Sequence, residues 1–120
     1  MGRGGEGFPP ERRLRRRPDF LETYETGRRA GGRFVVVFAC PAEVDGPCLG
    51  ITVTRKVGTA AVRNRLRRQV REIFRRSVVT RAVAPCRLVV NVSPRAAAAS
   101  FSELRDEIER LVTRAARSPA

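Results

Sequence analysis

An amphipathic segment at residues 55–76, RKVGTAAVRNRLRRQVREIFRR, constrains the fold more than any other part of the chain. As a helix, at about 100° per residue, it places its large apolar side chains on one arc of roughly 120°. These side chains are Val62, Leu66, Val70, Ile73 and Phe74. We therefore expect one face of this helix to pack against the rest of the protein, with the opposite face left for other contacts.

The opposite face of the same segment is rich in cations. On the same angular estimate it carries Arg63, Asn64, Arg67, Arg68, Arg71 and Arg75. Exposed helix faces are often charged, but they usually mix signs, and Glu72 is the only acid between residues 55 and 76. The chain as a whole has a formal net charge of +13. We therefore expect this face to bind a polyanion, most commonly a nucleic acid, rather than only to be solvated.

The length of 120 residues suits one domain with a single core. Residues 1–12 are rich in glycine and charge and predict a flexible arm, residues 13–117 the domain, and residues 118–120 a disordered tail. Residues 18–27, PDFLETYETG, predict a short helix, because Pro18 suits the first turn and Gly27 a C-terminal stop.

Three segments have the β-branched and alternating character of strands: RFVVVFAC at residues 33–40, Leu49 to Thr54, and RLVVNVSP at residues 87–94. Ser100 and Glu103 form a capping box ahead of a final amphipathic helix. The order of helix, strands, long helix, strand and helix predicts an α+β fold. We expect a small two-layer sandwich with helices on one side of a sheet.

Several functional classes are disfavoured by residue content. The longest apolar run, near residues 34–40, is far shorter than the about 20 residues of a spanning helix, so we expect a cytoplasmic protein without membrane contact. Cys40, Cys48 and Cys86 show neither paired spacing nor a histidine partner, which argues against a zinc site and a disulfide framework. With no histidine and no metal-ligand cluster, the chain offers no plausible nuclease site.

One long motif carries a family resemblance. Residues 49–75, LGITVTRKVGTAAVRNRLRRQVREIFR, resemble the signature of the bacterial ribonuclease P protein: an LGI strand, a glycine turn, A-V-x-R-N-R and then R-E-x-F. The resemblance extends to Arg13 and Leu14, Asp19 and Phe20, the LVVNVSP strand and the ELRDEIERL helix. It covers about residues 13 to 116.

This resemblance implies the protein subunit of the ribonucleoprotein that removes the 5′ leader from precursor tRNA. In that family the RNA subunit is the catalyst and magnesium ions act with it, so the protein is expected to be an accessory subunit with no catalytic residues and no metal site of its own. The implied fold is a four-stranded mixed sheet with helices on one face and a left-handed βαβ crossover, an exception to the usual handedness.

The resemblance also implies two sets of site residues. Those expected to bind the RNA subunit are Arg55, Lys56, Arg63, Asn64, Arg65, Arg67, Arg68 and Arg71. A cleft for the single-stranded leader is expected at Phe20, Tyr24, Val35 and Val37. Val37 stands where some relatives carry tyrosine, and ordinary core packing at i,i+4 is the alternative for Phe20 and Tyr24.

The expected partners are thus the catalytic RNA subunit and precursor tRNA. A ribosomal or other structural RNA-binding protein of similar fold is the alternative, because it would share the charge but not the R-N-R segment together with the leader positions. Charge alone would also permit DNA binding, but the layout contains no recognisable helix-turn-helix.

Overall fold

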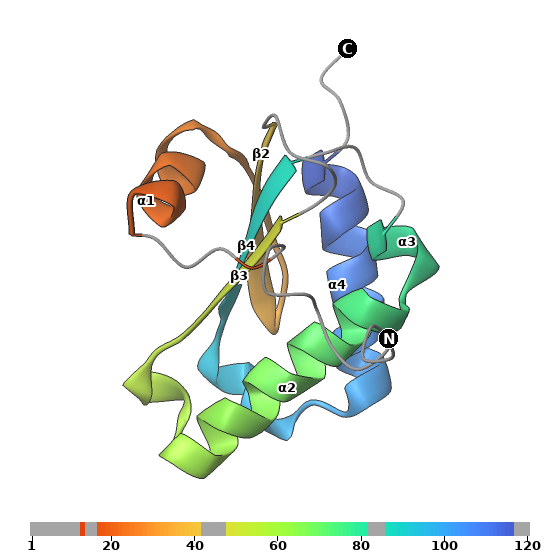
Figure 1. The fold of residues 1–120 in the computed structure, drawn as a ribbon. Helices are drawn as coiled ribbons and strands as arrows, with labels where there is room; N and C mark the ends of the chain where they lie inside the picture. The colour runs from red at the N-terminus through yellow and green to blue at the C-terminus, as the bar shows by residue number, and fades with distance from the viewer. Residues whose placement is uncertain (1–12, 14–16, 42–47, 82–85, 117–120) are drawn as a thin grey trace, which may run out of the picture.

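Four strands form one sheet with helices on both sides of it in the computed structural model (Figure 1). The structure describes residue 13 and residues 17–41, 48–81 and 86–116, so the predicted arm and tail lie outside the described residues. In chain order the elements are α1 (Arg17–Thr26), β1 (Arg28–Gly31), β2 (Val35–Pro41), β3 (Cys48–Val53), the 3-10 helix η3 (Arg55–Val57), α2 (Ala60–Arg76), α3 (Val78–Arg81), β4 (Cys86–Val92), the 3-10 helix η4 (Pro94–Ala98) and α4 (Phe101–Ala116).

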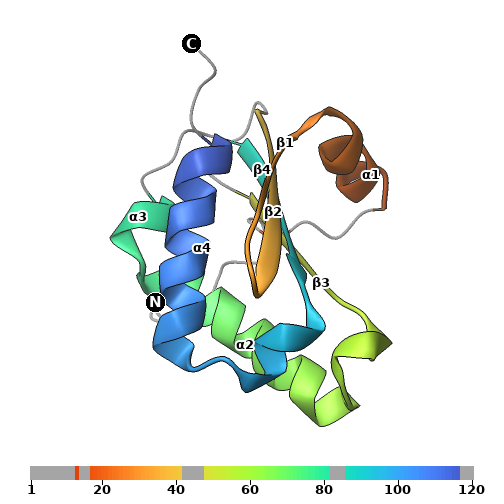
Figure 2. The same cartoon turned by 180° about the vertical axis from the view of Figure 1, so that it is seen from behind.

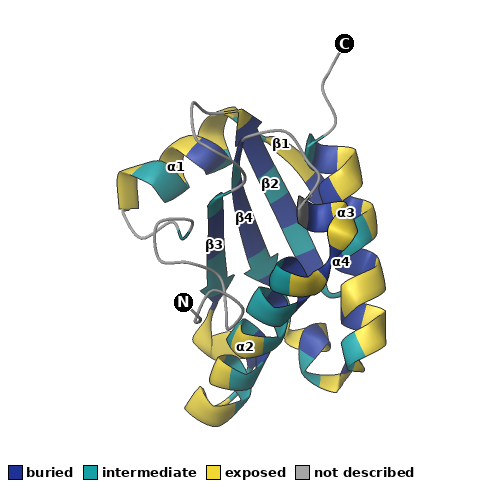
Figure 3. Cartoon of the chain, turned by 45° about the vertical axis from the view of Figure 1, so that its right-hand side comes forward, coloured by how far each residue is buried: buried dark blue, intermediate teal, exposed yellow. Residues whose placement is uncertain are grey.

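The sheet has the mixed topology that the family resemblance implies. Its strand order is β1-β2-β4-β3, in which β2 pairs antiparallel with both β1 and β4, and β3 pairs parallel with β4. Helix α2 lies in the connection from β3 to β4. In Figure 3 the helices α2 and α4 are in front of the sheet, β3 and β4 point downward, and β4 lies to the right of β3. This βαβ crossover is therefore left-handed.

Strand β1 was not predicted from the residue pattern, because its sequence RRAG has no apolar alternation. It forms as an edge strand along β2, with Arg29 opposite Phe38 and Gly31 opposite Val36. Gly27 allows the chain to turn tightly from α1 into β1. A Cβ at this position would lie 2.4 Å from the carbonyl oxygen of Thr23, so any other residue would force the backbone to move.

The core lies between the sheet and the pair α2 and α4. On α2 the predicted apolar stripe is confirmed, because Leu66, Val70, Ile73 and Phe74 are buried and Val62 packs against them. They meet the inward side chains of the strands, which include Val35, Val37, Leu88 and Val90, all completely buried. Figure 3 shows the buried positions recurring along the strands and along the inner sides of the helices.

The capping box predicted at the start of α4 is confirmed. The Ser100 amide donates to Glu103 Oε1 at 2.9 Å, and the Glu103 amide donates to Ser100 Oγ at 3.1 Å. This exchange supplies hydrogen-bond partners for two backbone groups that the helix itself leaves unpaired. It helps to set where α4 begins and which face the helix turns toward the sheet.

Glu107 is an acidic residue within the apolar stripe of α4, and it joins the helix to the β1–β2 turn. Its Oε1 accepts from the Arg33 amide at 3.0 Å, and its Oε2 accepts from the amides of Phe34 and Val35 at 2.6 and 2.9 Å. Only 6% of Glu107 is exposed, so these charge-assisted bonds offset the cost of burying the carboxylate. The turn is thereby fixed to the helix layer.

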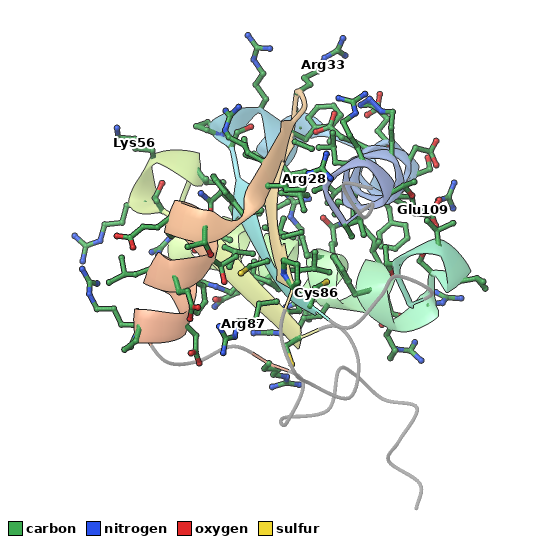
Figure 4. All side chains as sticks on the ribbon, turned by 90° about the horizontal axis from the view of Figure 1, so that it is seen from above. Arg28, Arg33, Lys56, Cys86, Arg87 and Glu109 are labelled. Atoms are coloured by element: carbon green, nitrogen blue, oxygen red, sulfur yellow. The ribbon has the colours of Figure 1, made fainter. Side chains whose placement is uncertain are left out.

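Helix α1 lies on the other face of the sheet. Figures 1 and 2 show it on the opposite side of the strands from α2 and α4, so the prediction of one covered face holds for those two helices, and α1 is additional. Arg87 of β4 attaches it through ion pairs to Glu22 at 2.8 Å and to Asp19 at 3.8 Å. In Figure 4 Arg87 lies beside this helix.

Candidate RNA interface

A sharp turn separates η3 from α2 and orients the basic helix. Gly58 has φ of 157°, and a Cβ there would lie 3.1 Å from Cβ of Val62, which favours glycine. Thr59 then caps α2, with its Oγ1 accepting from the Val62 amide at 3.3 Å. Residues 55–76 therefore form two elements, η3 and α2, separated by the glycine turn that the family resemblance implies.

Most of the predicted RNA-binding residues share one surface. Arg68 and Asn64 are exposed on α2, and Arg55 and Lys56 are exposed on η3 at the end of strand β3. In Figure 4 Lys56 points outward from η3. We define the arginine surface as these residues together with the half-buried Arg63, Arg67 and Arg71.

Arg67 and Arg71 are held at the junction of α2 with the edge of the sheet. Arg67 donates to Asn64 Oδ1 at 3.2 Å and to the Val53 carbonyl oxygen at 3.5 Å, which directs its guanidinium toward the end of β3. Burial, and then repulsion from Arg13 and Arg67, lower the pKa of Arg71 from its usual value. The guanidinium groups of Arg67 and Arg71 thus lie near each other and near Arg13 at this junction.

Arg65 is separate from this surface. Its guanidinium donates to the Ala97 carbonyl oxygen in η4 at 3.1 Å, so one of its donors supports the fold on the other flank of α2. Within α2 the single acid, Glu72, lies toward the C-terminal end. It accepts from Arg75 Nε at 3.1 Å, and this hydrogen bond is the main cause of its lowered pKa. The N-terminal part of α2 is left with one sign of charge.

The sheet face that α1 approaches is polar and aromatic. The Tyr24 hydroxyl donates to Asn91 Oδ1 at 2.8 Å and lies 3.2 Å from Thr52 Oγ1. Its ring meets Phe38 edge to face, with centroids 4.9 Å apart and planes at 83°. We define the α1 face as these four residues together with Val36. All of them are half-buried, so they are partly open to contact.

Comparison with known proteins identifies the family. A family model described as Ribonuclease P matches residues 8–116. The chain belongs to the family of bacterial ribonuclease P protein components. It is 45% identical over 111 residues to the ribonuclease P protein component of Acidothermus cellulolyticus, covering 89% of this chain and 90% of the relative. It is 39% identical over 106 residues to that of Thermotoga maritima, covering 88% and 83%.

Solved structures agree with this assignment. The fold is similar to the RNase P protein from Thermotoga maritima, with a TM-score of 0.77, 34% identity and coverage of 85% of this chain and 96% of that one. It is also similar to the Staphylococcus aureus RNase P protein, with a TM-score of 0.76, 26% identity and coverage of 88% and 97%. This chain is thus a protein subunit of ribonuclease P, an RNA-based endoribonuclease, and it assists 5′-leader processing of precursor tRNA. A ribonuclease P RNA is its partner.

Two of the leader positions expected from the ribonuclease P resemblance are wrong. Val35 and Val37 are 0% exposed and point into the core against the helix layer, so they are not available to an RNA strand. Val36 and Phe38, the alternate residues of β2, face α1 instead. The apolar run VVVFAC carries no polar alternation, so the pattern could not assign its two faces.

The other two leader positions are half-buried on α1. Tyr24 lies on the α1 face, although its hydroxyl and ring edge are engaged by the sheet. Phe20 is one helical turn earlier on the same side of α1. The aromatic residue of β2 that accompanies them is Phe38, one position after the residue expected. The pairing of β2 with β4 is the signal that assigns the face. Asn91 and Arg87 form the polar side of β4, and they lie opposite Val36 and Cys40, which share their face of β2 with Phe38.

The described part of the chain contains neither a cluster of metal-ligand side chains nor a helix that could span a membrane. Within residues 13, 17–41, 48–81 and 86–116, no three His, Cys, Asp or Glu side chains group as metal ligands would. None of the helices in the described part of the chain combines the length and apolar character needed to cross a bilayer.

Proposed function

We propose that the arginine surface binds the ribonuclease P RNA and that the α1 face contacts the single-stranded 5′ leader of precursor tRNA. Magnesium ions would act with the RNA subunit rather than at a site on this protein. The observation that carries the proposal is the single-sign row of cations on η3 and α2, at exposed or half-buried positions: Arg55, Lys56, Arg63, Arg67, Arg68 and Arg71.

The arginine surface suits a folded RNA because a guanidinium group can contact two phosphate oxygens at once. Arg68 is exposed at the centre of α2, and Arg55 and Lys56 extend the same charge beyond the N-terminal end of the helix. Each phosphate contact releases counterions, so affinity should fall steeply as salt is raised. The hydrogen bonds of Arg67 to Asn64 Oδ1 and to the Val53 carbonyl oxygen direct its guanidinium toward the end of β3.

The α1 face suits an unpaired strand for a different reason. Its aromatic rings can stack on bases or make apolar contacts without regard to sequence. The Tyr24 hydroxyl bonds to Asn91 and Thr52 hold one ring in place, and Phe38 packs against its edge. These contacts would hold the two rings in one conformation before the single-stranded leader binds.

The test uses two variants and two binding assays, with the holoenzyme reconstituted at one magnesium concentration. Arg68→Ala should weaken binding of the RNA subunit and reduce the salt dependence of log K by about 0.7 to 0.9, the share of one phosphate contact. Phe38→Ala should leave that assembly intact and reduce the preference for leader-bearing over mature tRNA by about tenfold, the value of one stacked base.

Arg114→Ala is the matched control for the loss of charge, since Arg114 is exposed on α4 away from both surfaces. It should resemble the wild type in both assays. A wild-type salt dependence in Arg68→Ala would contradict the assignment of the arginine surface. Loss of RNA-subunit assembly in Phe38→Ala, with no change in leader preference, would make Phe38 a structural residue.

A further inference from the structure

Arg29 brings a cation to the α1 face from strand β1. In the antiparallel pair of β1 and β2, Arg29 lies opposite Phe38 and Gly31 lies opposite Val36. Residues directly opposite in such a pair project to the same side of the sheet, with Cβ atoms about 5 Å apart. Arg29 therefore lies beside Phe38 on the α1 face. It is exposed, unlike the half-buried Phe38.

Gly31 provides the place for the Arg29 guanidinium. A Cβ added to Gly31 would lie 3.6 Å from Nη2, 3.7 Å from Nη1 and 3.8 Å from Cζ of Arg29. These are ordinary contact distances, so the guanidinium covers the position from which any other side chain would project. A branched residue at position 31 would need the space that the guanidinium occupies, whereas glycine leaves it open.

The charge of Arg29 remains available for a ligand. Among the residues that the structure describes, the Arg29 side chain makes no hydrogen bond or ion pair. Two acids of the neighbouring α1, Asp19 and Glu22, are paired with Arg87 on the same side of the sheet. Arg33 is at the β1–β2 turn and points outward from it in Figure 4, so it does not take the place of Arg29.

We propose that Arg29, placed over Gly31, binds a backbone phosphate of the leader beside the nucleotide whose base contacts Phe38. This inference rests on the proposed leader-binding role of the α1 face and adds its phosphate contact. A cation next to an aromatic ring is the combination by which proteins hold single-stranded nucleic acid without reading its sequence. β1 and the arginine surface lie at opposite edges of the sheet, so the leader rather than the RNA subunit is the expected source of the phosphate.

The experiment measures binding of precursor and mature tRNA to the reconstituted holoenzyme with Arg29→Ala, Gly31→Val and the double variant. Each single variant should bind leader-bearing precursor about fivefold more weakly, as for one exposed charge contact. The salt dependence for precursor should fall by about 0.7 in Arg29→Ala. Gly31→Val should act by displacing the guanidinium, so the double variant should be no weaker than Arg29→Ala. Mature tRNA and RNA-subunit binding should not change.

A chemical arm identifies the phosphate. In a series of precursors, each carries one neutral methylphosphonate at a different leader position. At the position that Arg29 contacts, wild type and Arg29→Ala should bind the modified precursor equally, because the charge that Arg29 would bind is gone. If no leader position has this effect, or if Arg29→Ala weakens binding of the RNA subunit instead, the inference is wrong. Arg114→Ala serves again as the charge control. Arg29→Gln, which keeps most of the side chain, provides a second test that does not alter strand β1.

The same assay separates this inference from the function on which it rests. If Phe38→Ala reduces leader preference and Arg29→Ala does not, the α1 face still binds the leader and only the role of Arg29 is overturned. If Phe38→Ala has no effect on leader preference, the proposed leader face itself is wrong and the inference fails with it.

Discussion

Val37 and Phe38 are consecutive residues of β2, yet they belong to two different environments. Val37 is 0% exposed and is part of the core beneath α2 and α4. Phe38 is half-buried, meets the ring edge of Tyr24 and lies opposite Arg29. The comparison shows that one face of the sheet forms the main core, whereas Phe38 on the other face is partly accessible.

The helices explain the difference between the two faces. α2 and α4 are 17 and 16 residues long, and their broad apolar stripes seal one face. α1 has 10 residues, of which only Thr23 is buried, so it covers the other face incompletely. The strands match this arrangement, because Thr52, Arg87 and Asn91 turn polar groups toward α1.

The largest expected effect compares adjacent residues of β2. Val37→Asn should destabilise the protein by about 3 kcal/mol or more, because it removes buried apolar surface and leaves an amide without partners. Val36→Asn makes the same chemical change on the α1 face and should cost less than about 1 kcal/mol. Urea unfolding of both variants measures the difference. Equal losses would show that the two faces are not distinct in stability.

A smaller effect is expected from the link between the β1–β2 turn and α4. Glu107→Gln should reduce the free energy of unfolding by about 1 to 3 kcal/mol, because a neutral amide replaces a carboxylate that accepts from three backbone amides. Asp106→Asn is the control, since Asp106 is exposed and pairs only with the adjacent Arg105 in the described structure. Hydrogen exchange at Val35 should be faster only in Glu107→Gln, and unchanged exchange would contradict the role of Glu107 in holding the β1–β2 turn.

The smallest expected effect is a difference in how fast two of the cysteines are alkylated. Cys40 and Cys48 lie opposite Arg87 and so project toward the α1 face, whereas Cys86 is the next position and is in the core. Burial, the main cause, and the two neighbouring thiols raise the pKa of Cys86 from 9.0 to about 11. At pH 8, alkylation followed by mass spectrometry should therefore modify the half-buried Cys48 well before Cys86.

The raised pKa of Cys86 also gives a sign for the pH dependence of stability. The folded protein holds this proton more tightly than the unfolded chain, so the contribution is fully present below pH 9 and is lost as pH rises through about 11. Cys86→Ala should remove this part of the alkaline decline in the free energy of unfolding. A decline of unchanged size in the variant would contradict it.

The amino-acid sequence by itself determined the helical layer and its charge. The apolar stripe of α2, the capping box of α4 and the row of arginines are local patterns, because side chains three and four residues apart share a helix face whatever the rest of the fold does. The R-N-R segment likewise indicated the family that the family model then matched.

Only the tertiary structure decided which residues of the sheet face α1. β1 has no apolar pattern and forms because β2 offers it an edge, and the uniform run VVVFAC acquires two distinct faces only when α2 and α4 cover one of them. Glu107 interrupts the apolar stripe of α4, and only the fold brings to it the three backbone amides of the β1–β2 turn that accompany its burial. The physical reason is common to all three: the burial and pairing of a strand residue depend on neighbours that are distant in the chain.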